Sequence, residues 1–320
     1  MKRRIFLSAL TGLALAVSVP AMASSDPVKL VVAFTAGGPV DIIARSMGEQ
    51  LAKQLGRTVI VENRPGANGN IAAAYVAGAH KDGSVLFLTS VGAVAISGAL
   101  YGSLSYDPAK DFAPVSRVVN NATVFVVNPN NPAVDAADFV KRSKDQKQPY
   151  AIGSSGIGSI PHLTLELFQD ATGANVLHVP YKGASQVVND VLGGHVDGFF
   201  GDLPGLINQI QAGKLKPLGV ASAQPNPLLP NVKTLAEQGI AGVESNNWYG
   251  LLAPAGTPPE TIAKLNEAVR ATLSDATVRG RLEGLGAEVS PSSPEELKQL
   301  IEADTAKWSG LIKSKNIQPE

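Results

Sequence analysis

The stretch KLVVAFTAGGPVDIIAR, residues 29–45, shows most clearly how this chain is built. Its apolar run, Leu30–Phe34, stops at Thr35-Ala36-Gly37-Gly38, and a helical pattern opens directly with Pro39 and Asp41. This order predicts a buried strand, a tight glycine turn and a helix N-terminus, because proline suits the first helical position. The first turn of a helix presents unpaired N–H groups and a partial positive charge, and glycines let a ligand approach them. We therefore expect this turn to hold an anion, with a carboxylate as the expected group.

The N-terminus has the three parts of a secretory signal peptide. Lys2-Arg3-Arg4 is basic, Ile5–Val19 is mostly apolar, and Ala21-Met22-Ala23 matches a small-residue cleavage site. We expect residues 1–23 to be removed, so that the mature protein begins near Ser24. The absence of cysteine excludes lipid attachment through that residue and means that stability comes from a core rather than from disulfides. We expect a protein of the Gram-negative periplasm.

The composition of the mature chain narrows its partners. The full sequence has 27 basic and 27 acidic residues, and removing residues 1–23 takes away three basic ones. The resulting net charge of −3 argues against nucleic acid, whose binding proteins concentrate positive charge. No later segment reaches the ~18 apolar residues that could span a bilayer. The remaining 297 residues could form one large domain or two domains of ordinary size.

Strand and helix patterns alternate along the chain. We predict strands at 29–34, 58–62, 85–89, 124–127, 150–152, 176–179, 196–200, 216–221 and 248–252, and helices at 41–55, 70–79, 136–143, 163–173, 186–192 and 206–212. Two more helices begin at TPPE (257–260) and SPEE (293–296), where a hydroxyl N-cap, a proline and a glutamate follow in order. This alternation predicts an α/β fold with mostly parallel sheets flanked by helices.

The simplest assembly of these elements has two domains. The first comprises residues 24–124 plus 223–320, and the second, residues 125–222, is inserted into it. Ligands of open parallel sheets bind outside the carboxyl ends of the strands. We therefore expect a ligand cleft between the domains, with a glycine turn from each domain facing it.

The second glycine-rich turn is Gly153–His162, where a strand again leads into a helix. Its hydroxyl residues Ser154, Ser155 and Ser159 could donate hydrogen bonds to one point, which suits a carboxylate. The competing interpretation is that Ser159 only caps the following helix. Asp41 at the first turn is equally open: it either complements the helix dipole or binds a water or a ligand amine.

Two further strand ends carry candidate ligand contacts. His178-Val179-Pro180-Tyr181-Lys182-Gly183 leads into another helix, and Tyr181 or the backbone at Gly183 and Ala184 could line the cleft. Lys182 is expected to be a solvated charge. Phe199–Pro204 ends a further strand, and it places Asp202 where it could face the gap.

An enzyme would need a nucleophile and a base, or a metal. Ser154 or Ser155 with His162 and Asp202 has the residue types of an acyl-transfer triad. However, GSSG is not the G-x-S-x-G nucleophile elbow. The four histidines, His80, His162, His178 and His195, show no metal-ligand spacing, and no cofactor motif such as G-x-G-x-x-G occurs. We predict no metal, no cofactor and no catalysis, with a serine hydrolase as the alternative.

The chain closely resembles the Bug-type extracytoplasmic solute receptors, which are the binding proteins of tripartite tricarboxylate transporters. The resemblance covers essentially all of the mature sequence. It rests on AFTAGGPVD, VENRPGANGNIAAAYVA, LSYDPAKDFAPVS, GSSGIGSIPH, VPYKGASQVVNDVLGGHVD, FFGDLPG and YGLLAPAGTPP, which occur in this order.

This resemblance implies a two-domain periplasmic binding fold, similar to type II, that closes by a hinge over one small organic carboxylate. It implies transient contact with membrane transporter subunits and a monomeric receptor; a sensor for a signalling partner would bind its ligand in the same way. The ligand-binding residues that the two turns and their neighbours imply are Phe34, Thr35, Gly37, Gly38, Asp41, Ser90, Ser154, Ser155, Gly158, Ser159, His162, Tyr181, Gly183, Ala184 and Asp202.

The chain departs from the family pattern in two places. In the first loop, Thr35-Ala36 stands where the family commonly has prolines, and Pro39-Val40 stands where it has hydroxyl residues. Asp202 stands where the family often has asparagine. An added acid disfavours a second ligand carboxylate unless one of the two is protonated, and it favours an amine or a hydroxyl. The sequence leaves the identity of the ligand open.

Overall fold

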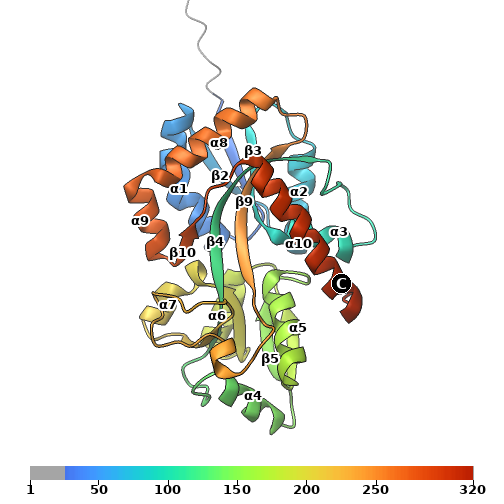
Figure 1. Cartoon of the computed structure of the whole chain (residues 1–320), viewed down its shortest axis with the longest axis vertical. Helices are drawn as coiled ribbons and strands as arrows, with labels where there is room; N and C mark the ends of the chain where they lie inside the picture. Colours follow the sequence, from blue (N-terminus) through green and yellow to red (C-terminus); the bar gives the residue numbers. More distant parts are fainter. Residues whose placement is uncertain (1–25, 320) are drawn as a thin grey trace, which may run out of the picture.

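The computed structural model describes residues 26–319, and the expected signal peptide lies outside these residues. The described chain forms two lobes that are stacked along the long axis of the molecule (Figure 1). Each lobe has its own β-sheet with helices around it, and two long strands run between the lobes. The two-lobed α/β architecture that the sequence predicts is therefore confirmed.

The first lobe is built on the strand order β2-β1-β3-β9-β4, with β10 on the far side of β4. Its strands are β1 (Val28–Val32), β2 (Val59–Asn63), β3 (Val85–Ser90), β9 (Asn246–Pro254), β10 (Ala287–Val289) and the first part of β4 (Phe112–Val127). Its helices are α1 (Pro39–Leu55), η1 (Ala67–Gly69), α2 (Asn70–Ala77), η2 (Gly92–Ile96), α3 (Ser97–Leu100), α8 (Pro259–Ser274), α9 (Ala276–Gly284) and α10 (Pro294–Lys315).

The second lobe continues from the last part of β4 through β7, β5 and β6, and β8 also pairs with β4. Its strands are β5 (Tyr150–Ser154), β6 (Val176–Pro180), β7 (Gly198–Asp202) and β8 (Lys216–Val220). Its helices are α4 (Ala136–Lys144), α5 (Ile160–Thr172), α6 (Ala184–Gly193), η3 (Leu203–Gly205), α7 (Ile207–Gln211) and η4 (Ala236–Gln238).

The sheets are parallel where strands alternate with helices and antiparallel elsewhere. β1 pairs in parallel with β2 and β3, and β5 pairs in parallel with β6 and β7, as the alternation predicts. β9 and β4 are antiparallel to each other and to their other neighbours. The sequence pattern shows only the last four residues of β4, which is 16 residues long.

β4 belongs to both sheets and changes partner halfway along. Its pairing with β9 ends at Ala122, opposite Asn246, and its pairing with β7 begins at Thr123, opposite Asp202. Val119 packs in the core of the first lobe, and Phe125 packs in a core of the second. Asp202 therefore lies where the two sheets meet.

The hydrophobic cores indicate which segments pack in each lobe. The expected domain boundaries stay a prediction. One core holds the first lobe together, and two smaller cores lie on the two faces of the second sheet. Leu229, Leu235, Ile240 and Val243 pack in the cores of the second lobe. Because these residues belong to the segment 223–320, we propose that the second lobe extends to Val243.

Three helix starts test the capping predictions. Ser159 accepts a hydrogen bond from the His162 N–H and caps α5, and Ser293 forms a complete capping box at α10. The prediction that Thr257 caps α8 is wrong, because Pro258 is the N-cap residue and no side chain of residues 26–319 caps this helix. The Thr257 hydroxyl instead donates to the Pro254 carbonyl at 2.8 Å. Within residues 26–319, no helix has the length and apolar character needed to cross a bilayer.

Candidate functional site

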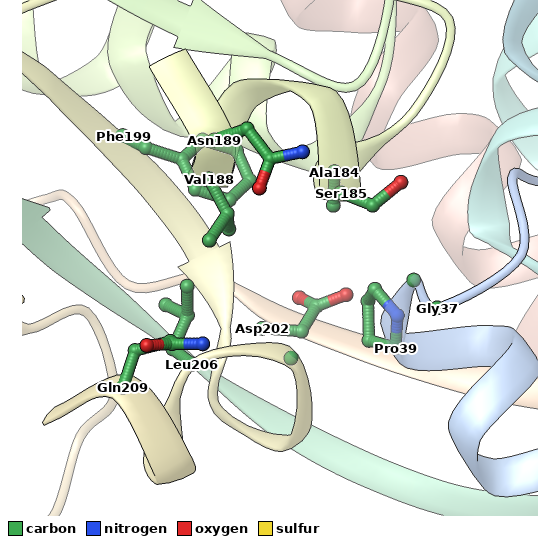
Figure 2. Close-up of a pocket in the computed structure, with 12 residues that line it drawn as sticks. Gly37, Pro39, Ala184, Ser185, Val188, Asn189, Phe199, Asp202, Leu206 and Gln209 are labelled. Atoms are coloured by element: carbon green, nitrogen blue, oxygen red, sulfur yellow. The ribbon is translucent and has the colours of Figure 1, made fainter. Parts of the chain in front are cut away.

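Two adjoining cavities lie between the lobes and share Pro39, Ala184 and Asp202. The larger one has a volume of about 170 Å³ (Figure 2) and is lined by Gly37, Gly38, Pro39, Ala184, Ser185, Val188, Asn189, Phe199, Asp202, Gly205, Leu206 and Gln209. The smaller one, of about 20 Å³, is lined by Phe34, Pro39, Val40, Ser90, Ser155, Pro161, Ala184, Asp202 and Asn247. Both glycine turns thus border one cleft.

The first glycine turn is held rigid by the side chain of Asp41. Its carboxylate accepts hydrogen bonds from the Gly37 N–H at 2.9 Å, from Asn63 Nδ2 at 2.9 Å and from Arg45 Nε at 3.0 Å. Burial by itself raises the pKa of Asp41, but the bonds from Arg45, Gly37 and Asn63 outweigh burial and lower the pKa. Both oxygens of this carboxylate are occupied within the first lobe.

Thr35, in the same turn, contacts the second lobe directly. Its Oγ1 lies 2.7 Å from the Ser185 hydroxyl, and the two residues are 150 positions apart in the chain. A Cβ placed on Gly183 would lie 2.4 Å from the same Thr35 oxygen. The absence of a side chain at Gly183 therefore allows the lobes to come this close.

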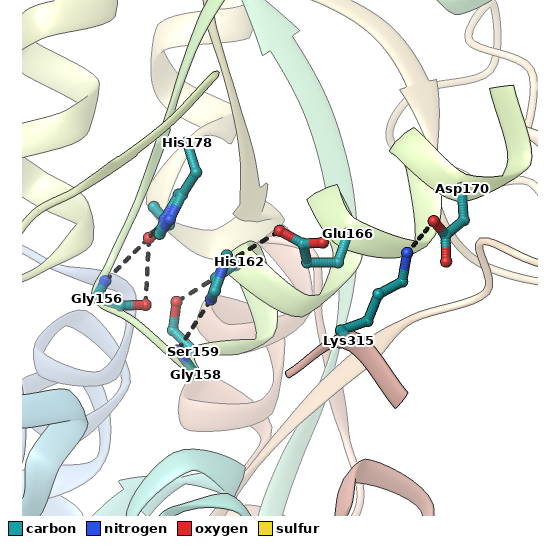
Figure 3. A network of polar contacts seen from close by, with 9 residues as sticks. Gly156, Gly158, Ser159, His162, Glu166, Asp170, His178 and Lys315 are labelled. Atoms are coloured by element: carbon teal, nitrogen blue, oxygen red, sulfur yellow. Dashed lines mark hydrogen bonds and ion pairs between the residues drawn. The ribbon is translucent and has the colours of Figure 1, made fainter. Parts of the chain in front are cut away.

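The second glycine turn is held by an internal network of polar contacts (Figure 3). The Ser154 hydroxyl shares a 2.6 Å hydrogen bond with His178 Nε2, and the Gly158 N–H donates to His162 Nδ1 at 3.0 Å. His162 Nε2 lies 3.3 Å from Glu166 Oε1. These bonds occupy the side chains of Ser154 and His162 inside the turn, and the residues of this segment that line the cleft are Ser155 and Pro161.

The two histidines of this network stack face to face. Their ring centroids are 3.8 Å apart with an interplanar angle of 9°. Burial, together with the neighbouring His162, lowers the pKa of His178 to about 3. The hydrogen bond from His162 lowers the pKa of Glu166 against the opposing effect of burial. His178 is therefore a neutral imidazole that fixes Ser154.

An ion pair joins the lobes at the outer end of this network. Lys315, at the end of α10 in the first lobe, contacts Asp170 on α5 of the second lobe (Figure 3). The N-terminal part of α5 also packs on the first core through Ile160 and Leu163. The two lobes are thus in contact on this side of the molecule as well as at Thr35.

Asp202 lies at the base of the cleft, and its carboxyl group is buried. Asn247 Nδ2 donates to its Oδ2 at 2.8 Å, and the Tyr249 hydroxyl donates to the same oxygen. Its Oδ1 has no hydrogen-bond partner among the described residues. Burial raises the pKa of Asp202 to about 7, although the two donated bonds lower it. Figure 2 shows this carboxyl group beside Pro39, facing Ala184 and Ser185.

The residues that sequence reasoning proposed fall into two groups, and their assignment to a ligand stays a prediction. The structure brings seven of them to the walls of the cleft cavities: Phe34, Gly37, Gly38, Ser90, Ser155, Ala184 and Asp202. The other eight do not line these cavities, and most of their side chains have partners elsewhere: Thr35, Asp41, Ser154, Gly158, Ser159, His162, Tyr181 and Gly183.

Sequence reasoning missed several polar residues that line the cleft, among them Asn189, Gln209 and Asn247. Asn247 stands in the run Ser245-Asn246-Asn247 at the start of β9, and no motif marks it. Asn68 is a second omission: it is buried, has a positive φ of 50° and has no hydrogen-bond partner for its amide among the described residues. Its Nδ2 lies 3.6 Å from where a Cβ on Gly158 would be.

The residues of the alternative hydrolase triad do not form a relay. His162 is bonded to Gly158 and Glu166, and Asp202 is bonded to Asn247 and Tyr249. Ser154 pairs with His178 and is fully buried. Within residues 26–319, no group of three or more histidine or acidic residues is arranged to hold a metal ion.

The fold and the cleft are those of a two-lobed solute-binding protein. The family model of the tripartite tricarboxylate transporter family receptors matches residues 43–317, and the chain belongs to this family. It is 32% identical to the protein BugT of Bordetella pertussis over 288 aligned residues. The aligned region covers 90% of this chain and 88% of BugT.

Several solved structures are similar to this chain in sequence and in fold. The periplasmic binding protein BugD is 34% identical and superposes with a TM-score of 0.88 over 92% of this chain and 99% of BugD. A Rhodopseudomonas palustris protein bound to adipate is 34% identical with a TM-score of 0.88, over 92% of this chain and 98% of that one. MatC of the same organism, bound to malate, is 31% identical with a TM-score of 0.85, over 89% and 98%.

Proposed function

We propose that this chain is a periplasmic receptor that captures a small organic carboxylate in the cleft and delivers it to the membrane subunits of a tripartite tricarboxylate transporter. The family supports the receptor role, and the adipate and malate structures of its relatives support a carboxylate ligand. The expected signal peptide supports export to the periplasm.

The observation that carries the proposal is a pair of helix N-termini without side-chain caps. α1 begins after Gly38 in the first lobe, and α6 begins after Gly183 in the second; no side chain in the described part of the chain caps either helix. Their first residues, Pro39 and Ala184, line both cavities. Uncapped helix N-termini attract anions through free N–H groups and the helix dipole. A carboxylate between them would be held from both lobes.

The charge of the cleft supports the same conclusion. Neither cavity is lined by a lysine or an arginine from the described part of the chain. The negative charge of a ligand would therefore be stabilised by the N–H groups of α1 and α6 and by the hydroxyls of Ser90 and Ser155, rather than by an ion pair. Such a site favours a small ligand that places a single carboxylate between the N-termini of α1 and α6.

Binding would operate by closure of the lobes. A carboxylate that touches both α1 and α6 binds the closed arrangement better than an open one, so it shifts the population towards closure. The Thr35–Ser185 hydrogen bond joins the lobes at the mouth of the same cleft, and it forms only when they meet. The transporter subunits would then recognise the closed receptor.

The test is a binding screen with purified mature protein. We expect one carboxylate from a panel of mono- and dicarboxylates to raise the melting temperature and to bind one molecule per chain in isothermal titration calorimetry. A panel that produces no shift at millimolar concentrations would contradict the carboxylate assignment. Size-exclusion chromatography with light scattering checks the proposed monomer.

We further propose that the chain binds without turning over its ligand. The burial of Ser154 and its pairing with the neutral His178 support a structural role for this serine. Activated esters should be hydrolysed no faster by the wild type than by the Ser155→Ala variant. Faster turnover that is lost on this substitution would favour the hydrolase alternative.

A further inference from the structure

Two buried acceptor oxygens at the base of the cleft have no donor among the described residues. They are Oδ1 of Asp202 and Oδ1 of Asn247, in residues that are 5% and 4% exposed. Both residues line the smaller cavity. A buried polar atom without a partner lowers stability, so most such atoms in proteins have one. Two unpartnered acceptors in one cavity point to a donor that comes from outside the chain.

The orientation of both oxygens is fixed by their neighbours. Asn247 Nδ2 and the Tyr249 hydroxyl both donate to Asp202 Oδ2. Because Nδ2 is the donor atom of the Asn247 amide, Oδ1 is necessarily its remaining acceptor. Because Asp202 Oδ2 already receives two bonds, Oδ1 is the atom left to meet a ligand.

The charge around Asp202 indicates which ligand group it can meet. Among the described residues that line the two cavities, Asp202 is the only one with a charged side chain. Tyr249, which contacts it from β9, has its own pKa raised by burial and by Asp202, so it stays a neutral donor. Asp41 on α1 is paired with Arg45 and does not line either cavity. A second anionic group placed against Asp202 would therefore meet no compensating cation.

We propose that Asp202, assisted by Asn247, selects ligands that carry a hydrogen-bond donor, a hydroxyl or an ammonium, in addition to their carboxylate. This inference rests on the proposed function, because the carboxylate itself is assigned to the N-termini of α1 and α6. The donor would then lie at the base of the cleft, where Asp202 Oδ1 and Asn247 Oδ1 both accept from it.

The ionisation of Asp202 gives the selection a pH dependence. Burial raises the pKa of Asp202 to about 7, so the group changes charge near neutral pH. An ionised carboxylate accepts from a hydroxyl or an ammonium, whereas a protonated one donates to a ligand carboxylate. Affinity for a donor-bearing acid should rise as the pH rises through about 7, and affinity for a dicarboxylate should fall.

The experiment compares acids of one carbon skeleton by isothermal titration calorimetry. The probes are butyrate, succinate, and the hydroxy- and amino-substituted butyrates with the substituent on each carbon in turn. We expect at least one substituted butyrate to bind wild-type protein about 10- to 100-fold more tightly than butyrate or succinate, as a bond to a charged group allows. The hydroxy and amino series show which donor is preferred.

The Asp202→Asn variant reverses the chemistry of this position while keeping its shape. Its amide oxygen can accept from Asn247 and Tyr249, which places the NH₂ group where Oδ1 faces the cavity. We expect the variant to lose the 10- to 100-fold preference (about tenfold per 1.4 kcal/mol) and to bind succinate better than the wild type does. If the wild type and the variant rank the ligands in the same order of affinity, the inference is overturned.

Two further variants separate binding from structure. Asp304→Asn changes another carboxyl that accepts from β9, through Trp248 Nε1 at 2.6 Å, but lies outside both cleft cavities; it should leave the ligand order unchanged. Tyr249→Phe removes one donor to Asp202, so the pH midpoint of donor-acid binding should move upward. A midpoint that does not move would contradict the inference. Failure of the wild type to bind any carboxylate would instead overturn the proposed function.

Discussion

At the first glycine turn both oxygens of Asp41 accept hydrogen bonds from the same lobe, whereas at the base of the cleft one oxygen of Asp202 has no donor among the described residues. Both groups are buried aspartates, yet the pKa of Asp41 is lowered and that of Asp202 is raised. The difference teaches that the turn is built to hold its own backbone in place. We infer that the base of the cleft instead meets a group from the ligand.

The largest expected effect tests the raised pKa of Asp202. The Asp202 carboxyl has a pKa of about 7 in the folded protein and 3.8 in the unfolded chain. Between these pH values the folded protein keeps the proton that the unfolded chain has lost. The contribution of Asp202 to stability is therefore lost as the pH rises through this window. Replacing it with asparagine should stabilise the unliganded protein by up to about 4 kcal/mol above the window and by little below it.

Urea unfolding of the wild type and of Asp202→Asn across this pH range measures the difference. A difference in unfolding free energy that does not grow with pH would mean that Asp202 ionises like an ordinary surface carboxylate. The contrast with Asp41 would then be lost.

The next effect tests the bracing of the first turn. Asp41→Ala leaves the Gly37 N–H without its acceptor and removes one of the two acceptors of the Asn63 amide, which keeps the Phe34 carbonyl, so unfolding free energy should fall by about 2–3 kcal/mol. Because the pKa of Asp41 is lowered, this contribution is present above pH 3.8 and is lost as the pH falls further.

Asp138→Ala is the matched control. Asp138 also accepts from an arginine four residues later and from a backbone N–H, but it lies on an outer helix of the second lobe, where solvent screens the pair, so its loss should cost less unfolding free energy than the loss of Asp41. An equal fall in unfolding free energy in both variants would show that Asp41 stabilises the protein no more than an exposed aspartate does.

A smaller effect tests how closely the two lobes approach at the mouth of the cleft. Gly183 has extended φ, so alanine fits its backbone, but the added Cβ would lie 2.4 Å from Thr35 Oγ1. Gly183→Ala should weaken ligand binding about tenfold, or about 1.4 kcal/mol, and leave the unliganded melting temperature nearly unchanged. Calorimetric titration and thermal melting give the two values.

The double variant Thr35→Ala/Gly183→Ala shows whether the clash is the cause. Removing the Thr35 hydroxyl should make the alanine at position 183 nearly harmless, so the two changes should not add. Additive losses would mean that Gly183 serves the ligand rather than the approach of the lobes. Gly48→Ala, at a helical position with open space around the added Cβ, controls for alanine itself.

The smallest effect concerns the ion pair at the far side of the cleft. Lys315→Ala removes the contact of α10 with Asp170, whose side chain is 50% exposed. Exposed ion pairs contribute about 0–1 kcal/mol, and salt screens them. Ligand affinity should change less than about threefold, and not at all in high salt; a larger, salt-resistant change would identify a second closure contact.

Much of the fold could be predicted because its elements are marked locally. The apolar run before Gly37, the proline at the start of α1 and the Ser293 capping box each follow from a few neighbouring residues. The long strand β4 could not be predicted in full, because its first part, Phe112–Asn121, carries polar residues that pair with β9 and β10. Its pattern depends on partners far away in the chain.

The candidate site divides in the same way. Gly37, Gly38 and Ala184 could be found because turns that open helices have recognisable sequences. Asn247 could not, because it contacts Asp202 across 45 positions of the chain and belongs to no local motif. The internal role of Ser154 depends on His178, which comes beside it only when β5 and β6 pair, whereas His162 meets Glu166 one turn later on the same helix.

The shared strand β4 makes the two halves of the molecule depend on each other during folding. Neighbouring residues of a strand face opposite sides, and Phe125 and Val127 face one core of the second lobe while Val124 and Val126 face the other. Deleting one residue near Ala122 would exchange these faces, so all four side chains would meet the wrong environment. A chain that ends at Ala122 would lack β9, which lies between β3 and β4 in the first sheet, so the first lobe should not assemble from this fragment alone.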